Sequence, residues 1–479
     1  MSVNSKIING GFYLTVVNVL SQFLVIVVNV ILARLLLPQD FGLVALTMTF
    51  MGFVSLFTNM GFGSSIIHES KINQNQLSSI YWLNYGLSIF SFLIVISTAN
   101  LAAAFYEEPM LTPIIGIAAI NMILQPFYIV QFKLLERNLE FKKISIINLS
   151  GTLIGSVAAI IGAYSGLGVY ALIIQALVSS GIRLVLILFF KRWWPNFYFD
   201  FPEIKHMVWY SVKFKGAQMA LYFERNIDYL ILGKFFTSAI LGYYAFAYNI
   251  MYTPVKRISY IFSQVLFPSF SSFKNDKQKI INGYFKSVNL IALVSIPGMT
   301  ILAFNADILI NTVFGPKWDA AIPIVRILCF AGAIQSISQF GSIIFSSIGK
   351  PEVEMYVSFG RTVLTILAIV IGVQFGILWV AYLLVVAKVL SYILFLVVLK
   401  RHISFKSIEL FRSLKGPIAS FLMLSTIYIL YSFGYLKIIP LIHLCLMIIV
   451  SLIMLYAFHR QTIMDILNVL KPKLTNALQ

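Results

Sequence analysis

The chain has 479 residues, of which 59% are hydrophobic and only 11% are charged. A soluble globular chain carries about 25% charged residues, so this composition excludes an ordinary soluble domain. The formal net charge is +18, but the basic residues lie mainly in short connections between apolar stretches, which indicates membrane topology rather than nucleic-acid binding. We therefore predict an all-α polytopic membrane protein.

Apolar segments of about 20 residues can cross a bilayer as a helix, and they recur along the whole chain. They predict fourteen membrane helices, with the limits 10–33, 40–66, 78–104, 110–132, 144–165, 168–190, 208–233, 239–266, 284–306, 320–346, 355–375, 377–399, 414–435 and 438–458. The first segment is too long for a signal peptide and is expected to remain as a helix. Prolines inside these spans, among them Pro126, are expected to kink them.

The distribution of Lys and Arg predicts the orientation of the chain. If the N-terminus is cytoplasmic, most of these residues fall in the inward connections and in the two tails. The outward connections then hold only four of them, which are Arg34, Lys234, Lys317 and Lys437. This asymmetry predicts that both termini are cytoplasmic.

An internal repeat divides the predicted helices into two sets. The stretch LARLLLPQDFGLVAL from Leu32 aligns without a gap with LGKFFTSAILGYYAF from Leu232, so that Gly42 matches Gly242. A second match aligns Gly162 with Gly372. We predict a six-helix N-terminal lobe over residues 1–195, a six-helix C-terminal lobe over 196–402, and two appended helices with a cytoplasmic tail over 403–479. Two parallel repeats with a site between them are typical of transporters.

Charged residues inside the predicted spans are the candidate functional residues. Glu224 and Asp228 lie about 40° apart around the helix 208–233, and Arg225 lies about 60° beyond Asp228, so we expect the three to share a face and to neutralise one another. Some cations near the inward ends of spans are counted with the cytoplasmic connections: Lys213, Lys215, Lys286, Arg361 and Lys415. The remaining intramembrane cations are Arg183, Arg225, Lys256, Arg257, Arg326 and Lys388. These six cations outnumber the two carboxylates.

Cations at membrane depth need a counter-charge or water. Their excess predicts a cationic central cavity that binds an anionic substrate. Arg183, Arg257 and Arg326 are close enough to span ends for their head groups to reach the interface instead. Glu224 and Asp228 are either counter-ions or the site of a coupling proton or sodium ion.

Further residues carry weaker signals. A stripe of tyrosines with a neighbouring amide suits sugar rings, and it also suits ordinary helix packing; its members are Tyr244, Tyr248, Tyr252 and Asn249. The two cysteines, Cys329 and Cys445, lie in apolar spans and suggest neither a disulfide nor a metal site. Phosphate-binding loops and metal-binding motifs are absent from the sequence. We predict a protein that is not an enzyme and that needs no cofactor and no metal.

The sequence resembles the polysaccharide transporters of the MOP flippase superfamily, in particular the Wzx-like branch of O-antigen, colanic-acid and teichuronic-acid exporters. The resemblance is carried by LARLLLPQDFGLVALTMTF, NIDYLILGKFFTSAILGYYAFAYNI, RISYIFSQVLFPSFSSF and FGPKWDAAIPIVRILCFAGAIQSISQFGSIIFSSIGKPE. It implies a V-shaped two-lobe fold that flips undecaprenyl-pyrophosphate-linked oligosaccharide repeat units across the bacterial cytoplasmic membrane. It also implies membrane lipids as partners, H⁺ or Na⁺ as a coupling ion and a polysaccharide polymerase as a candidate partner.

Two other transport functions stay open. A multidrug or cation antiporter of the related MATE branch needs a buried carboxylate, which in many such proteins lies in the first lobe. The first six predicted spans contain none apart from Asp40, which is the first residue of the span 40–66 and is counted with the outward connection. A lipid II flippase would share the fold and the positive cavity. The segments quoted above are more similar to the polysaccharide branch.

Overall fold

Helices occupy all fourteen predicted span positions. The structure is a computed structural model that describes residues 3–58, 62–69, 71–272, 276–341, 344–345, 350–435, 439–440 and 442–457, and it contains no strand within these ranges. Ten of its helices are long and apolar enough to cross a membrane, and a bent pair raises this number to eleven. The other predicted spans correspond to α9 (Phe201–Phe235), α10 (Ser238–Ser272) and a shorter apolar helix, Ile442–Ala457. The prediction of an all-α multi-pass membrane protein is confirmed.

Large apolar side chains cover the outside of these helices. Leu101, Phe189 and Phe359 are 68%, 68% and 70% exposed, respectively. In water, exposed apolar side chains on this scale would drive association. In a bilayer they face lipid, whereas the backbone polar groups are satisfied inside each helix.

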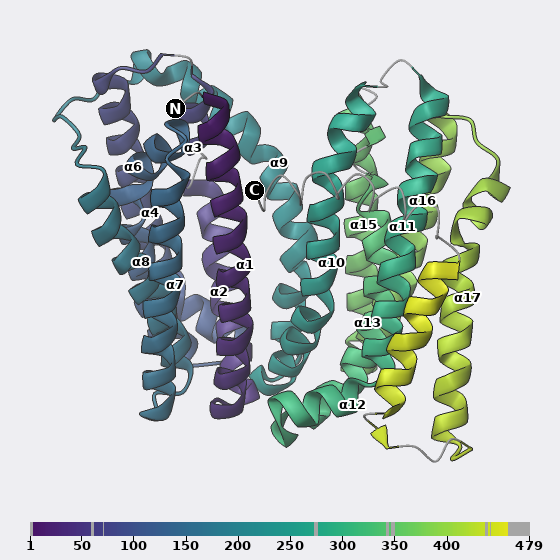
Figure 1. Ribbon diagram of the computed structural model, residues 1–479. Helices are drawn as coiled ribbons and strands as arrows, with labels where there is room; N and C mark the ends of the chain where they lie inside the picture. Colours follow the sequence, from purple (N-terminus) through teal and green to yellow (C-terminus); the bar gives the residue numbers. More distant parts are fainter. Residues whose placement is uncertain are drawn as a thin grey trace. The chain divides into compact units, whose positions relative to one another are not determined.

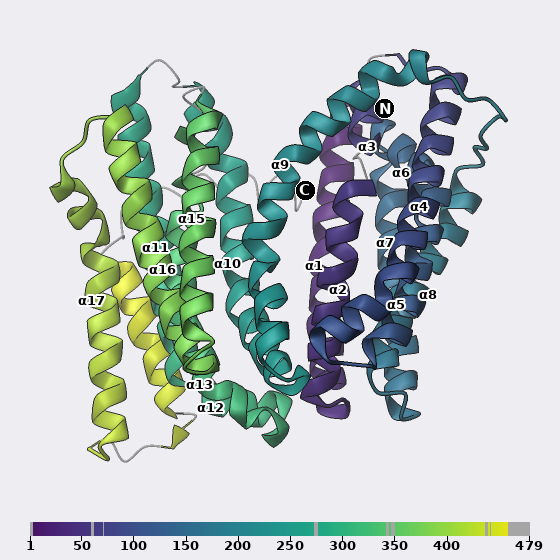
Figure 2. The same cartoon turned by 180° about the vertical axis from the view of Figure 1, so that it is seen from behind.

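The chain forms two compact units, Met1–Ala245 and Phe246–Gln479. The first unit ends within α10 and contains nine complete helices: α1 (Val3–Leu35), α2 (Pro38–Thr58), α3 (Phe62–His68), α4 (Gln74–Tyr106), α5 (Leu111–Leu124), α6 (Pro126–Arg137), α7 (Phe141–Tyr164), α8 (Val169–Phe190) and α9. Helix α7 packs along α8 and α1 (Figure 1), and α4 packs along α5 (Figure 2). Helix α9 packs on α2, α3 and α4. Its contacts therefore lie in the first unit, and the predicted lobe boundary between residues 195 and 196 stays a prediction.

The second unit holds the remainder of α10 and the helices that follow it. These are α11 (Lys277–Phe304), α12 (Ala306–Leu309), a π-helix (Ile310–Phe314), a 3₁₀ helix (Pro316–Ala321), α13 (Ile322–Ser338), α15 (Pro351–Gly372), α16 (Ile377–His402), α17 (Ser407–Ser432) and Ile442–Ala457. Helix α16 packs against both α13 and α15 (Figure 2). Helix α11 packs against α13 and α17. An aromatic core around the buried Tyr284, Phe345 and Phe395 joins this set.

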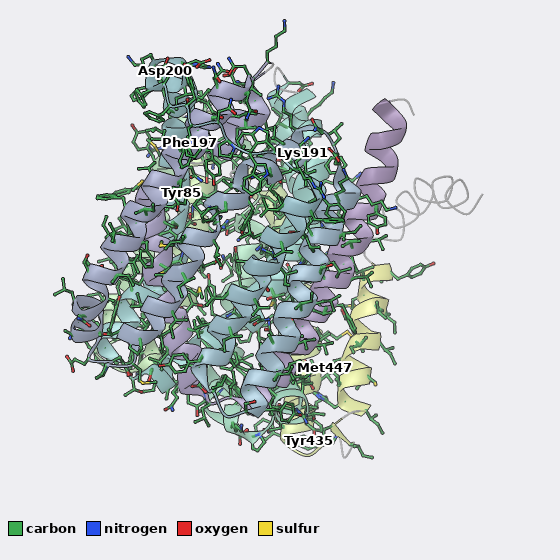
Figure 3. All side chains as sticks on the ribbon, turned by 90° about the vertical axis from the view of Figure 1, so that its left-hand side faces the viewer. Tyr85, Lys191, Phe197, Asp200, Tyr435 and Met447 are labelled. Carbon is green, nitrogen blue, oxygen red and sulfur yellow. The ribbon has the colours of Figure 1, made fainter. Side chains whose placement is uncertain are left out.

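The connection between α8 and α9 is held against α4 by hydrogen bonds. Side chains of α4 bond to its backbone: Gln74 Nε2 donates to the Trp194 carbonyl (2.9 Å), Trp82 Nε1 donates to the Asn196 carbonyl (2.8 Å), and the hydroxyls of Ser78 and Ser79 accept from the N–H groups of Asn196 (2.9 Å) and Asp200 (3.0 Å). Figure 3 shows Lys191, Phe197 and Asp200 at one end of this unit, beyond Tyr85 on α4. The Phe197 side chain is 98% exposed. This segment is therefore an ordered cap on α4 rather than a loose linker.

The predicted span 110–132 is broken in the middle. Helices α5 and α6 meet at Gln125 with a bend of 47°. The break falls where Pro126 begins α6. Proline has no N–H to continue the α5 hydrogen-bond ladder, and its ring clashes with the preceding turn, so the expected kink at Pro126 is present.

Candidate substrate site

The carboxylate of Asp228 is held by an aromatic hydroxyl. Asp228 is 5% exposed on α9. Its Oδ2 accepts a hydrogen bond of 2.8 Å from the Tyr244 hydroxyl on α10, and its Oδ1 accepts one of 3.0 Å from the Tyr229 N–H. The ring of Tyr229 also packs edge-on against Tyr244, with centroids 6.0 Å apart. Asp228 therefore contributes to the packing of α9 on the start of α10.

The other two charged residues predicted to share a face of α9 are more exposed than Asp228. Arg225 is exposed and Glu224 is half-buried. Arg225 forms no ion pair with any residue that the structure describes. The expectation that Arg225 and the two carboxylates neutralise one another is therefore wrong, because the buried Asp228 is directed to Tyr244 and the exposed guanidinium is not paired with it.

Lys256 and Arg257 occupy consecutive positions of α10 in the second unit. Both are exposed, and neither has an ion-pair partner in the described ranges. Consecutive residues on a helix point about 100° apart. The two cations therefore widen the positive surface of α10 rather than act at a single point.

Arg326 has a partner that the sequence had placed in an outward connection. Its Nη2 lies 3.3 Å from Oδ1 of Asp307, which belongs to the short helix α12. Arg326 therefore does not belong to the set of uncompensated cations. The predicted excess of positive charge inside the spans is smaller by one for this reason.

Arg183 and Lys388 complete the predicted set of cations. The half-buried Arg183 on α8 packs against α7, where a Cβ added to Gly151 would lie 2.9 Å from Arg183 Cγ and 3.1 Å from its Nε. Arg183 Nε is buried and has no hydrogen-bond partner in the described residues. Lys388 is half-buried on α16. Their role in substrate binding stays a prediction.

The tyrosine stripe on α10 divides into two parts. Tyr244 is fully buried and bonded to Asp228, so in this conformation its ring does not offer a face to a sugar. Tyr248 and Tyr252 are half-buried and stack on each other, with centroids 5.6 Å apart and an interplanar angle of 24°. Asn249 between them is exposed. Contacts of these last three residues with sugar stay a prediction.

A cavity inside the first unit, lined by apolar residues and several uncharged polar ones, was not predicted from the sequence. A hollow of about 250 Å³ lies between α2, α5 and α8, and a smaller one of about 30 Å³ adjoins it beside α4. The polar side chains that line the two hollows are Ser55, Asn84, Ser88, Ser91, Asn121 and Gln125. The Asn121 Oδ1 atom is buried without a hydrogen-bond partner in the described residues.

The sequence does contain a signal for this cavity. Asn84, Ser88 and Ser91 recur at i, i+4 and i+7, and Asn121 and Gln125 recur at i and i+4, which places each set on one helix face. No charged residue lines either hollow. Such a lining suits water and neutral hydroxyl groups better than ions.

A largely buried ion pair in the second unit was also not predicted from the sequence. Arg361 and Glu354 form an ion pair on α15, and their side chains are 11% and 17% exposed. The sequence placed Arg361 in a cytoplasmic connection. Helix α15 instead begins at Pro351, so Arg361 lies well inside it.

Ionic contacts also tie the α4–α5 turn to the α9–α10 turn within the first unit. Lys234 Nζ lies 2.7 Å from Glu107 Oε1, and the Ser238 N–H donates to Glu108 Oε1 at 3.3 Å. The hydrogen bond from Lys234, followed by its positive charge, lowers the pKa of Glu107 below its ordinary value of 4.5. The turn carrying Glu107 and Glu108 therefore holds the start of α10 near the end of α4.

The chain is similar to proteins of surface-polysaccharide assembly. The model of a family described as "Polysaccharide biosynthesis protein" matches residues 31–323. Lipopolysaccharide biosynthesis protein WzxC of Escherichia coli (strain K12) is 27% identical over 380 residues, which are 78% of this chain and 76% of that protein. Teichuronic acid biosynthesis protein TuaB of Bacillus subtilis (strain 168) is 27% identical over 345 residues, or 71% of each chain.

A solved structure shares the fold over most of the chain. Lipid II flippase MurJ in an inward closed conformation superposes with a TM-score of 0.73 at 14% sequence identity, covering 94% of this chain and 99% of that one. At this identity the likeness shows the fold alone. It confirms the predicted fold of the MOP transporters.

Proposed function

Because the chain belongs to the family of polysaccharide biosynthesis proteins, we propose that it flips undecaprenyl-pyrophosphate-linked oligosaccharide repeat units across the cytoplasmic membrane. The named relatives serve the biosynthesis of lipopolysaccharide and of teichuronic acid, so a building unit of a surface polysaccharide is the substrate class that fits best. The glycan itself is left open. The chain acts as a transporter and not as an enzyme.

The observation that carries this proposal is the set of exposed cations in predicted spans. Arg225, Lys256 and Arg257 have no ion-pair partner in the described ranges. A cation in the middle of a bilayer costs on the order of 3 kcal/mol even on the lenient insertion scale, and such residues normally face water or a counter-charge. A pyrophosphate brings that counter-charge, and Arg offers a planar fork of donors for its oxygens.

The transport step follows from these charges. The three cations attract the pyrophosphate and any acidic sugars from the cytoplasmic side, while the polyprenyl chain remains in the lipid. Alternating access between the lobes 1–195 and 196–402 then carries the head group to the outer side, with both termini cytoplasmic. Lys388 and Arg183 assist in the same cationic pathway, and Tyr248, Tyr252 and Asn249 contact the sugars.

The uncharged polar side chains in the cavity of the first unit support a substrate that is rich in hydroxyl groups. Asn121 Oδ1 lacks a hydrogen-bond donor, and a sugar hydroxyl or a water bound by one can provide it. A cavity of about 250 Å³ is at the small end of ligand pockets. It therefore accommodates one sugar ring or a few waters rather than a whole oligosaccharide.

A lipid II flippase is the second candidate, because the fold of MurJ extends over nearly the whole chain. Both substrates carry a pyrophosphate on a polyprenyl chain, so the cations do not distinguish them. The family match and the named relatives favour the polysaccharide unit. A multidrug antiporter fits less well, since it has no need of exposed intramembrane cations.

The test is accumulation of lipid-linked repeat units in the host after deletion of the gene. Complementation compares the wild type with Arg225→Ala, and Lys71→Ala, which removes an exposed cation from a connection, is the matched control. We expect wild type and Lys71→Ala to clear the intermediates and Arg225→Ala to fail at equal membrane abundance. Intact surface glycan in the deletion strain, with raised sensitivity to cationic drugs, would overturn the proposal in favour of the antiporter.

A further inference from the structure

A histidine of the last described helix lies in a polar cluster that the transport step above does not use. His443, on the helix Ile442–Ala457, is only 1% exposed. Its ring stacks on Tyr431 of α17, with centroids 4.1 Å apart and an interplanar angle of 14°. Figures 1 and 2 show the helix, in yellow, beside α17. Tyr428 of the same helix is the next ring, at 6.2 Å.

The hydrogen bonds around Asn305 determine which ring nitrogen of His443 carries the proton. Asn305 Nδ2 donates to the Ile301 carbonyl at 2.8 Å and to Met447 Sδ at 3.4 Å. A carbonyl only accepts, so the amide nitrogen must be on that side and Oδ1 must face His443, 3.2 Å from its Nδ1. An amide oxygen has no hydrogen, so Nδ1 carries the proton.

In the neutral ring the other nitrogen, Nε2, then carries the lone pair. His443 Nε2 is buried and has no hydrogen-bond partner in the described residues. A buried acceptor without a donor is costly. Imidazole is the side chain whose charge changes near neutral pH without any perturbation, so Nε2 can bind a proton if an acceptor with a negative charge then pairs with the new N–H group.

A counter-charge for the resulting imidazolium is nearby. The titratable and charged groups around the ring are Asp307 of α12, Arg326 of α13, and Tyr428 and Tyr431 of α17. Asp307 lies two residues after Asn305, whose Oδ1 is 3.2 Å from His443 Nδ1, and its negative charge acts on the ring. Its Oδ1, although 3.3 Å from Arg326 Nη2, has no hydrogen bond, and Arg326 Nε has none either. The carboxylate of Asp307 is therefore near the guanidinium of Arg326 without being hydrogen-bonded to it through Oδ1.

We propose that His443 Nε2 is the proton-binding site of this chain, and that proton uptake transfers Asp307 from Arg326 to the imidazolium. The proton comes from water on the predicted outer side, the ring gains one positive charge, and loss of the proton returns Asp307 to Arg326. The exchange changes how the last helix is held to α12 and α13. This proposal rests on the proposed transport function, for which it names H⁺ as the coupling ion.

The site can be observed directly in the purified full-length chain. The sequence has five histidines, and replacing His68, His206, His402 and His459 by Gln leaves His443 as the sole one. Nitrogen-15 NMR of histidine-labelled protein in lipid then reports tautomer and charge as a function of pH. We expect an Nδ1–H ring that takes up a proton below about pH 6.5, the ordinary value for imidazole, because burial opposes the charged ring. If replacing four histidines prevents folding, the difference between wild type and His443→Gln assigns the same resonance.

The role of Asp307 is tested by Asp307→Asn. Without the carboxylate, the imidazolium loses its counter-charge. The midpoint of protonation should then require a proton concentration about tenfold higher, which is equivalent to about 1.4 kcal/mol. A His443 resonance that stays neutral down to pH 5, or that carries its proton on Nε2, overturns the proposal. A midpoint unchanged by Asp307→Asn overturns the exchange of partners.

Transport by the two histidine variants separates this site from the proposed function. In the deletion host, His443→Gln should lose the dependence of glycan export on external pH, whereas His402→Gln, which alters a ring bonded to the Val398 carbonyl at 3.0 Å on α16, should keep it. If His443 titrates as expected but the deletion causes no accumulation of intermediates, the flippase function fails and the proton site remains. If export is intact and His443 never titrates, the proton site fails and the flippase function remains.

Discussion

Gly42 on α2 and Gly242 on α10 each face a backbone carbonyl of the other helix. A Cβ added to Gly42 would lie 1.8 Å from the Ser238 carbonyl oxygen, and one added to Gly242 would lie 1.8 Å from that of Pro38. These two glycines are the pair that the internal repeat aligns. The contact is therefore reciprocal, and neither position can accept a side chain while the helices remain this close.

Replacement of Gly42 by Ala should force α2 and α10 apart at this contact. Overpacking typically costs about 1–3 kcal/mol, and a clash with a backbone atom cannot be relieved by a rotamer change, so we expect the upper part of this range. Thermal denaturation in detergent, followed by size-exclusion chromatography, measures it. Gly181→Ala on α8 is the matched control, because nothing lies within 4 Å of its added Cβ. That variant should be neutral or more stable by about 0.5–1 kcal/mol, and equal losses at the two positions would contradict the contact.

Tyr244→Phe should destabilise the first unit through Asp228. The substitution removes the hydroxyl that donates to Asp228 Oδ2 and leaves a buried carboxylate oxygen with one donor fewer, at a cost of about 2 kcal/mol. Tyr252→Phe is the control, since Tyr252 is half-buried and its ring contact with Tyr248 does not need the hydroxyl. Unfolding in a denaturant series compares the two. Equal stability of both variants would show that the Tyr244–Asp228 bond contributes nothing measurable.

The Glu107–Lys234 ion pair should give the chain an acid-sensitive contribution to stability. The pKa of Glu107 is lowered in the folded protein, first by the hydrogen bond from Lys234 and then by its charge. The stabilisation is therefore fully present above the ordinary pKa of 4.5 and is lost as the pH falls through the lowered value. Melting temperatures of the wild type and Glu107→Gln should differ at pH 7 and converge in acid. A difference independent of pH would assign the effect to packing instead.

The two ion pairs of the second unit should differ in energetic importance. The Arg361–Glu354 side chains are 11% and 17% exposed, whereas those of Arg326 and Asp307 are 39% and 48% exposed. Glu354→Gln leaves a buried guanidinium without its counter-charge, at about 3 kcal/mol. Asp307→Asn should cost less than about 1 kcal/mol, because water screens a pair that is this exposed. Equal losses of stability would mean that burial does not distinguish the pairs.

The positions of the helices could be predicted from the sequence, because a bilayer requires long apolar segments with internally bonded backbones. The partners of the charged residues could not. Helical periodicity placed Arg225 and Asp228 on one face, but the carboxylate is directed to Tyr244, a residue of the next helix. Asp307 was assigned to a connection because the predicted span ends at residue 306, whereas in the structure it lies in α12, a helix of only four residues. Which side chains meet across helices depends on packing that no single-helix pattern contains.

The role of His443 also could not be predicted from the sequence. A single histidine in an apolar span has no pattern of its own, and its meaning comes from Asn305 and Asp307, more than 130 residues earlier in the chain. The cavity of the first unit was nearer to being predictable. Its amides and hydroxyls do recur at helical spacing, and a kink at Pro126 was expected, but neither pattern shows that the neighbouring helices leave space beside the bend.

The bend at Pro126 gives the cavity a feature that does not depend on the polar side chains of its lining. Pro126 has no N–H to offer the carbonyl oxygen of Met122, four residues earlier, and Met122 lines both hollows. The carbonyl of Met122 therefore lacks the helical hydrogen-bond donor that any other residue at position 126 would offer. Replacing Pro126 by alanine would restore this donor and remove the cause of the bend, without altering a polar side chain of the lining.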